Sequence, residues 1–236
     1  METLPALAAQ LPRLFGPLDL AAFALLLLAM ALTSWLIEHP PRRRPSVSKL
    51  MEGARRDWMA AFSARDHRIF DATLLTTLRG GAAFFASTCL IAIGGVAALL
   101  GQTERVLGVV RDLGAAPGET AVPVWEAKLL VLAVLLVNAF LKFVWSHRLF
   151  GYCAVLMGAM PGPEEGDPGP AIDRATTIQL TAARNFNRGL RGVYFALAAL
   201  AWFLGPVPLM VAVVLTAAML ARREFFSESR RALLRR

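Results

Sequence analysis

The stretch "GVYFALAALAWFLGPVPLMVAVVLTAAML" (residues 192–220) carries no charge, and its one interruption is "GPVP" at residues 205–208. It is longer than the ~20 residues that one helical crossing of a ~30 Å hydrocarbon core needs. Two prolines so close together break a helix readily, because each removes a backbone donor and restricts the residue before it. The stretch is therefore either a single kinked span or a helical hairpin that turns back at the prolines.

The charge of the following tail favours the hairpin. Six arginines come after the stretch, namely Arg222, Arg223, Arg230, Arg231, Arg235 and Arg236. Basic residues of membrane proteins collect on the cytoplasmic side, and a hairpin keeps this tail with the other basic segments. Each arm (residues 192–204 and 207–221) would be only ~20 Å long. The hairpin would therefore be re-entrant or would be lengthened by flanking residues, and we expect other spans to shield the turn.

Three more apolar blocks, at residues 18–37, 80–100 and 128–145, are each long enough to be a transmembrane helix. Hydrophobic residues make up 56% of the chain and stand in uninterrupted blocks, which indicates a membrane protein rather than a soluble core. We predict one all-α, multi-pass membrane domain over residues 1–236.

The orientation follows from the basic residues. They are dense between the first two blocks and after the third, and sparse before the first. This bias predicts the N-terminus outside and the C-terminus in the cytoplasm. It also accounts for the net charge of +8 without a nucleic-acid partner.

The inner connections have patterns of their own. Residues 46–77 predict a cytoplasmic amphipathic region, in which Met51, Trp58 and Phe62 share a face opposite basic residues. Its apolar face would lie at the lipid headgroups, pack on the protein's own inner face, or do both. "PGPEEGDPGP" (residues 161–170) has the composition of a flexible linker.

A cluster of charged residues precedes the second apolar block. Arg65, Asp66, Arg68 and Asp71 lie in "ARDHRIFD" (residues 64–71). They would form an ion-handling or catalytic cluster, or Arg68 and Asp71 would simply pair on a helix at the membrane boundary. A lipid-modifying enzyme would use the two aspartates near the headgroups, but no recognised motif supports one.

Two polar residues interrupt the third block. Asn138 and Lys142 lie one helical turn apart in an apolar context, where polar groups are costly and often functional. Lys142 would otherwise extend to the cytoplasmic headgroups, and Asn138 would bond to another helix. Together with the break at residues 205–208, this pair suggests an alternative function, a transporter or channel for small solutes or ions.

Basic residues form a stripe ahead of the fourth block. Arg184, Arg188 and Arg191 follow a spacing of four and three, so that they lie on one helical face. The two cysteines stand in unlike contexts and no Cys/His spacing suits a metal. We therefore predict no metal site, no cofactor and no catalytic residue.

Four segments together resemble a known family. They are "ARDHRIFDATLL", "GAAFFAST", "FLKFVWSHRLFGY" and "NFNRGLRGVYFALAALAWF", and the chain is similar from about residue 58 to about residue 226 to the membrane family called domain of unknown function 599. The resemblance implies a multi-pass membrane protein found in bacteria and plants, without an established activity. No catalytic residue carries over from it.

These observations lead to one functional hypothesis. We expect a non-enzymatic protein of the bacterial inner membrane whose basic cytoplasmic face binds anionic lipid headgroups, a partner membrane protein or a second copy of itself. The candidate residues are Arg65, Asp66, Arg68, Asp71, Asn138, Lys142, Arg148, Arg184, Asn187, Arg188 and Arg191.

Overall fold

The computed structural model describes residues 15–65, 67–112, 122–162 and 166–235, and these form helices without any strand. The all-α prediction is confirmed. In chain order the elements are α2 (Pro17–Glu38), α3 (Val47–Ser63), α4 (Ile69–Leu100), α5 (Thr103–Asp112), α6 (Val122–Gly158), α7 (Gly169–Ala199), η1 (Leu200–Leu204), α8 (Pro206–Phe225) and α9 (Glu228–Leu234).

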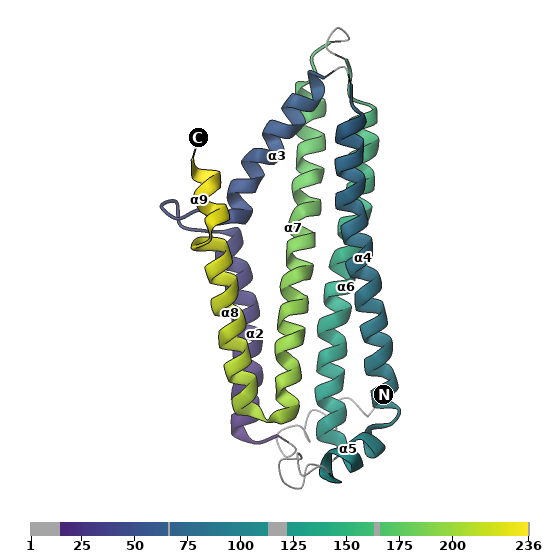
Figure 1. Cartoon of the computed structure of the whole chain (residues 1–236), viewed down its shortest axis with the longest axis vertical. Helices are drawn as coiled ribbons and strands as arrows, with labels where there is room; N and C mark the ends of the chain where they lie inside the picture. The colour runs from purple at the N-terminus through teal and green to yellow at the C-terminus, as the bar shows by residue number, and fades with distance from the viewer. Residues whose placement is uncertain (1–14, 66, 113–121, 163–165, 236) are drawn as a thin grey trace, which may run out of the picture.

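Three helices, α2, α4 and α6, are long and apolar enough to cross a membrane, as predicted. Two of these helices are longer than the hydrocarbon core of a bilayer is thick. With 32 and 37 residues, α4 and α6 are about 48 and 55 Å long, against a hydrocarbon core of ~30 Å. Figure 1 shows α4, α6 and α7 rising beyond the ends of α2 and α8. The bundle therefore has a part of bilayer length and an extension at one end.

The side chains on the outside of the bundle fit a lipid environment. Large apolar residues such as Leu28, Ile91, Val134 and Leu215 are exposed, with Ile91 reaching 77% exposure. A water-soluble protein rarely exposes contiguous apolar surface of this kind. The surface therefore supports the conclusion that these helices face hydrocarbon.

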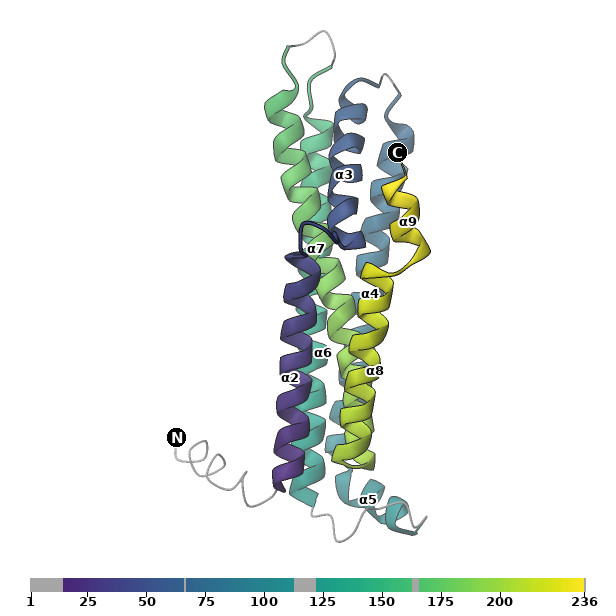
Figure 2. The same ribbon diagram turned by 90° about the vertical axis from the view of Figure 1, so that its left-hand side faces the viewer.

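The last apolar stretch forms the hairpin. The chain reverses after η1, and α8 returns antiparallel to α7 and beside α2 (Figures 1 and 2). Gly205 adopts φ 123° and ψ 172°, which favours glycine, and Pro206 begins α8 at a position where its missing N–H costs nothing. The arms are lengthened as expected, because α7 begins at Gly169 and α8, with 20 residues, is about 30 Å long.

The turn of the hairpin is shielded by other spans, again as expected. Trp202 is 4% exposed, and its backbone carbonyl accepts a hydrogen bond from Lys128 Nζ at 3.0 Å. Its indole Nε1 donates to Asp19 Oδ1 at 2.7 Å, and the rings of Phe15 and Phe23 lie 5.6 Å away. The carbonyls that a helix end leaves unpaired need such donors at membrane depth.

The region predicted as amphipathic, residues 46–77, spans parts of two helices. It contains α3 and the first turns of α4, and the break at residues 64–68 separates them. Met59 and Phe62 of α3 are buried in a cluster with α6 and α7, so α3 packs on the protein's own extension. Ser46 caps α3 by accepting from the Lys49 amide, and its hydroxyl donates to the Ile37 carbonyl at 2.7 Å.

Candidate functional site

A polar cavity of about 270 Å³ lies where the ends of α2 and α8 meet α3 and α7. Beyond this level α6 and α7 continue into the extension of the bundle (Figure 1). The charged residues lining it are Lys49, Arg55, Arg184, Arg191, Arg223, Glu38, Glu52 and Glu224. Five cations therefore face three carboxylates, and we call this space the inner cavity.

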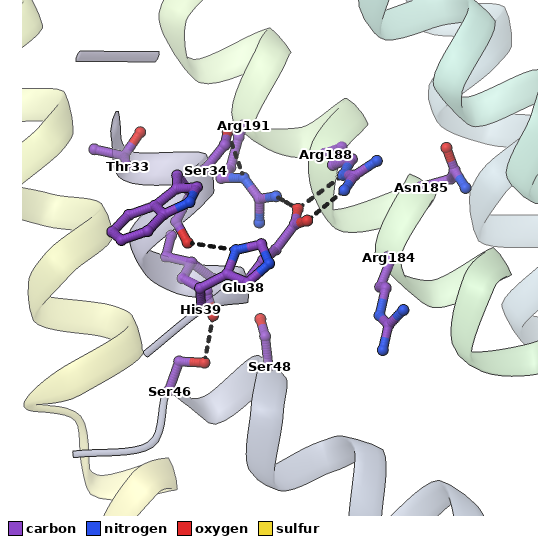
Figure 3. Close-up of polar contacts among 12 residues, drawn as sticks. Thr33, Ser34, Glu38, His39, Ser46, Ser48, Arg184, Asn185, Arg188 and Arg191 are labelled. Carbon is purple, nitrogen blue, oxygen red and sulfur yellow. Dashed lines mark hydrogen bonds and ion pairs between the residues drawn. The ribbon is translucent and has the colours of Figure 1, made fainter. Parts of the chain in front are cut away.

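Glu38, the last residue of α2, holds two of the predicted arginines. Arg188 donates to it through Nε at 2.8 Å and through Nη2, and Arg191 Nη2 donates to Glu38 Oε1 at 2.6 Å (Figure 3). Arg191 also donates to Ser34 Oγ at 3.2 Å and is buried. The arginine stripe is thus tied to α2 instead of lying free.

Glu52 of α3 neutralises the third arginine of the stripe. Arg184 donates to it through Nη2 at 2.8 Å and Nε at 3.1 Å, and Lys49 Nζ donates at 2.7 Å. Burial alone would raise the pKa of the Glu52 carboxyl, but the hydrogen bonds from Lys49 and Arg184 outweigh burial and hold it below its usual value of 4.5. Glu52 is therefore ionised at neutral pH and joins α3 to α7.

Glu224, near the end of α8, is bound by the first turn of α3. The amide and the hydroxyl of Ser48 donate to its two oxygens at 2.9 and 3.0 Å. A carboxylate is favourable at a helix N-terminus, where the amides are unpaired and the dipole is positive. Glu224 therefore acts as an internal anion that fixes the end of the hairpin to α3.

Arg55 and Asn187 line the inner cavity but make no hydrogen bond or ion pair with any described residue. Both are partly buried. Burial lowers the pKa of Arg55, which has the Cys153 thiol as its resolved electrostatic neighbour. Asn187 was a sequence candidate. Arg55 was missed, because nothing in the sequence sets it apart from the neighbouring Arg56.

The charged residues around the start of α4 contact neighbouring segments of the chain. Asp71 is fully buried, and its Oδ1 accepts from Trp58 Nε1 and Arg65 Nη1, each at 2.6 Å. The expected pairing of Arg68 with Asp71 is wrong. Arg68 precedes the first turn of α4, so helical spacing does not apply, and its guanidinium donates to the carbonyls of Met160 and Pro161. Asp66 lies outside the described residues.

The candidates of α6 are placed differently from one another. Asn138 is exposed on the bundle surface, and Arg148 donates to the Tyr152 hydroxyl at 2.5 Å. Lys142 is half-buried and interacts electrostatically with Glu38, Arg188 and Arg191. Gly205 stands between η1 and α8, at the far end of α8 from the cluster, so the structure does not bring the helix break together with Lys142 (Figure 1).

Long apolar helices in an all-α bundle define the class of this chain as integral membrane protein. Within the described part of the chain, no group of three or more His, Cys, Asp or Glu residues is placed to hold a metal ion. The model of a family described as "Protein of unknown function, DUF599" matches residues 21–229, and the chain belongs to this family. Comparisons with curated proteins and with solved structures gave no match.

Proposed function

We propose that this protein is a non-enzymatic component of the bacterial inner membrane that binds anionic lipid headgroups at its basic, cytoplasmic end. The observation that carries the proposal is an excess of cations at the end of α2. Lys142, Arg188 and Arg191 all interact with Glu38, and Arg191 interacts also with Glu224, so that three cations meet two carboxylates. Lipid phosphates supply the negative charge that this cluster lacks.

Aromatic side chains support this placement of the cluster at headgroup level. Trp35 lies one turn before the end of α2 and is 58% exposed, and Trp145 lies one turn after Lys142 and is 45% exposed. Tryptophan is enriched where hydrocarbon meets water. Lys142 extends from the apolar part of α6, where a lysine stem follows the helix and brings its ammonium to the phosphates.

The proposal is tested by replacing Lys142, which makes no hydrogen bond to a described residue, so that Lys142→Gln breaks none. Nanodiscs would contain equal amounts of phosphatidylglycerol and phosphatidylcholine, and native mass spectrometry would count the lipids retained. Wild type should retain phosphatidylglycerol selectively. Lys142→Gln should lower that selectivity about fivefold, since one basic residue near an anionic surface contributes ~1 kcal/mol.

The matched control is Arg174→Gln, which removes the same charge from an exposed position in the second turn of α7. It should leave lipid selectivity unchanged. Equal retention of both lipids by wild type, or equal losses in the two variants, would refute specific binding at the cluster.

A further inference from the structure

We propose that the inner cavity is a binding site for a phosphate monoester, with Arg55 as the principal ligand of the phosphate. The site adjoins the proposed lipid-binding cluster and shares Glu38 and Arg191 with it, but Lys142 and Arg188 do not line this cavity.

The proposal rests first on which cations of the inner cavity already have a carboxylate partner. Lys49 and Arg184 share Glu52, and Arg191 is paired with Glu38. Glu224 accepts hydrogen bonds from Ser48 and interacts electrostatically with Arg191. Among the described residues, two lining cations are left without a carboxylate, Arg55 and Arg223.

The two cations without a carboxylate partner determine which ligand charge the cavity favours. Arg223 makes one hydrogen bond, to the Tyr194 hydroxyl at 2.8 Å, and Arg55 makes none to a described residue. A surplus of two positive charges suits a phosphate monoester, which carries about −1.5 to −2 at pH 7, better than a single carboxylate. A guanidinium also matches phosphate geometry, because its planar fork donates two parallel hydrogen bonds.

Burial supports the same conclusion. A partly buried cation costs free energy unless an opposite charge or hydrogen-bond acceptor meets it. Arg55 has neither among the described residues, and Asn187, which also lines the cavity, offers an unused amide donor. An incoming phosphate would satisfy both side chains at once.

The size of the cavity limits the ligand. About 270 Å³ is slightly below the range of drug-sized pockets, ~300–1,000 Å³. A phosphate with a short organic group fits this space, and such a group is either a free metabolite or the headgroup of a lipid. The chemistry at Arg55 is the same for both sources, so the experiment must separate them.

The experiment uses the full chain in nanodiscs of phosphatidylcholine alone, titrated calorimetrically with inorganic phosphate and with glycerol 3-phosphate. Arg55→Gln should weaken binding by roughly ten- to a hundredfold, the effect of losing hydrogen bonds to a charged group. Arg56→Gln removes the same charge from the next, exposed residue of α3 and should change the affinity less than about twofold. Asn187→Ala should weaken binding by a smaller factor than Arg55→Gln.

A second arm identifies the source of the phosphate. In nanodiscs that contain phosphatidic acid, native mass spectrometry would count the lipids retained by wild type and by Arg55→Gln. Binding of either soluble phosphate supports a free ligand. Retention of a phosphatidic acid that depends on Arg55, without binding of the soluble phosphates, supports a lipid headgroup.

The proposal is overturned if none of these phosphates binds, or if Arg55→Gln and Arg56→Gln weaken binding equally. Arg55 makes no hydrogen bond to a described residue, so its replacement should not lower the midpoint of thermal unfolding, and weaker binding by Arg55→Gln would not come from misfolding. Lys142→Gln should leave phosphate affinity intact, which distinguishes this site from the lipid-binding cluster.

Discussion

Gln179 is fully buried on α7, and neither atom of its amide has a hydrogen-bond partner among the described residues. It lies between Ala175 and Ala182, whose carbonyls accept hydrogen bonds from Cys153 and Ser146 of α6. A buried polar group without a partner costs about 1–3 kcal/mol. The residue therefore weakens an otherwise well-packed contact between α6 and α7.

Replacing this amide with an apolar group of similar size should stabilise the protein. We expect Gln179→Met to increase the free energy of unfolding by about 1 kcal/mol or more, because it removes the unpaired amide and keeps the volume. The measurement is thermal unfolding in detergent followed by circular dichroism. Ser146→Ala, which removes a hydroxyl bonded to the Ala182 carbonyl at 2.8 Å, is the control and should destabilise. A loss of stability in Gln179→Met as large as in the control would contradict the expectation.

At this scale the sequence predicted the positions of charges better than their partners. The stripe of Arg184, Arg188 and Arg191 does lie on one face of α7, because its spacing is a local property of a helix. Its carboxylates are 132 to 153 residues away along the chain, at Glu52 and Glu38. Only the packing of α7 against α2 and α3 determines those pairs, and no local pattern reveals them.

Among the elements, the hairpin was predictable and the helix ends were not. A glycine and two prolines act on their own backbone, so their effect is visible in the sequence. The division between α3 and α4 lies at residues 64–68, where neither glycine nor proline stands. There the buried pairing of Asp71 with Trp58 and Arg65 holds the bend.

Gly205 should be sensitive to substitution because of its backbone angles. At φ 123° and ψ 172° an alanine is strained, which costs roughly 1–3 kcal/mol. We expect Gly205→Ala to lower the midpoint of thermal unfolding. Gly53→Ala is the matched control in the middle of α3, where an added Cβ meets no atom within 4 Å, and it should stabilise by up to about 1 kcal/mol. A neutral Gly205→Ala would argue against this conformation of the turn.

For the whole molecule, charge asymmetry predicted which ends of the helices lie together. The C-terminal residues lie at the same end as α3, where Arg230 Nε donates to the Pro45 carbonyl at 2.9 Å (Figure 1). The inner cavity at that end was not predicted. Its walls come from four helices that are distant in sequence, and a cavity depends on how they cross.

Cysteine labelling should reveal the orientation of this bundle in the membrane. Both native cysteines are buried, so single cysteines can be introduced beside them. In spheroplasts an impermeant maleimide should label Gln102→Cys, in the turn between α4 and α5, and should label Ser229→Cys only after permeabilisation. Both substituted residues are exposed. Labelling of Ser229→Cys in intact spheroplasts would reverse the proposed orientation.

The continuity of α7 from Gly169 to Ala199 has a mechanical consequence. This unbroken helix forms part of the cavity wall near its middle, at Arg184, Asn187 and Arg191, and continues from there into the apolar half that ends at Ala199. The only proline of α7, Pro170, stands in its first turn, so the part of the helix between the cavity and Ala199 has no proline to kink it. If a thinner bilayer tilts the apolar half of α7, the Asn187 side of the cavity must move with it. No kink separates the two parts of the helix.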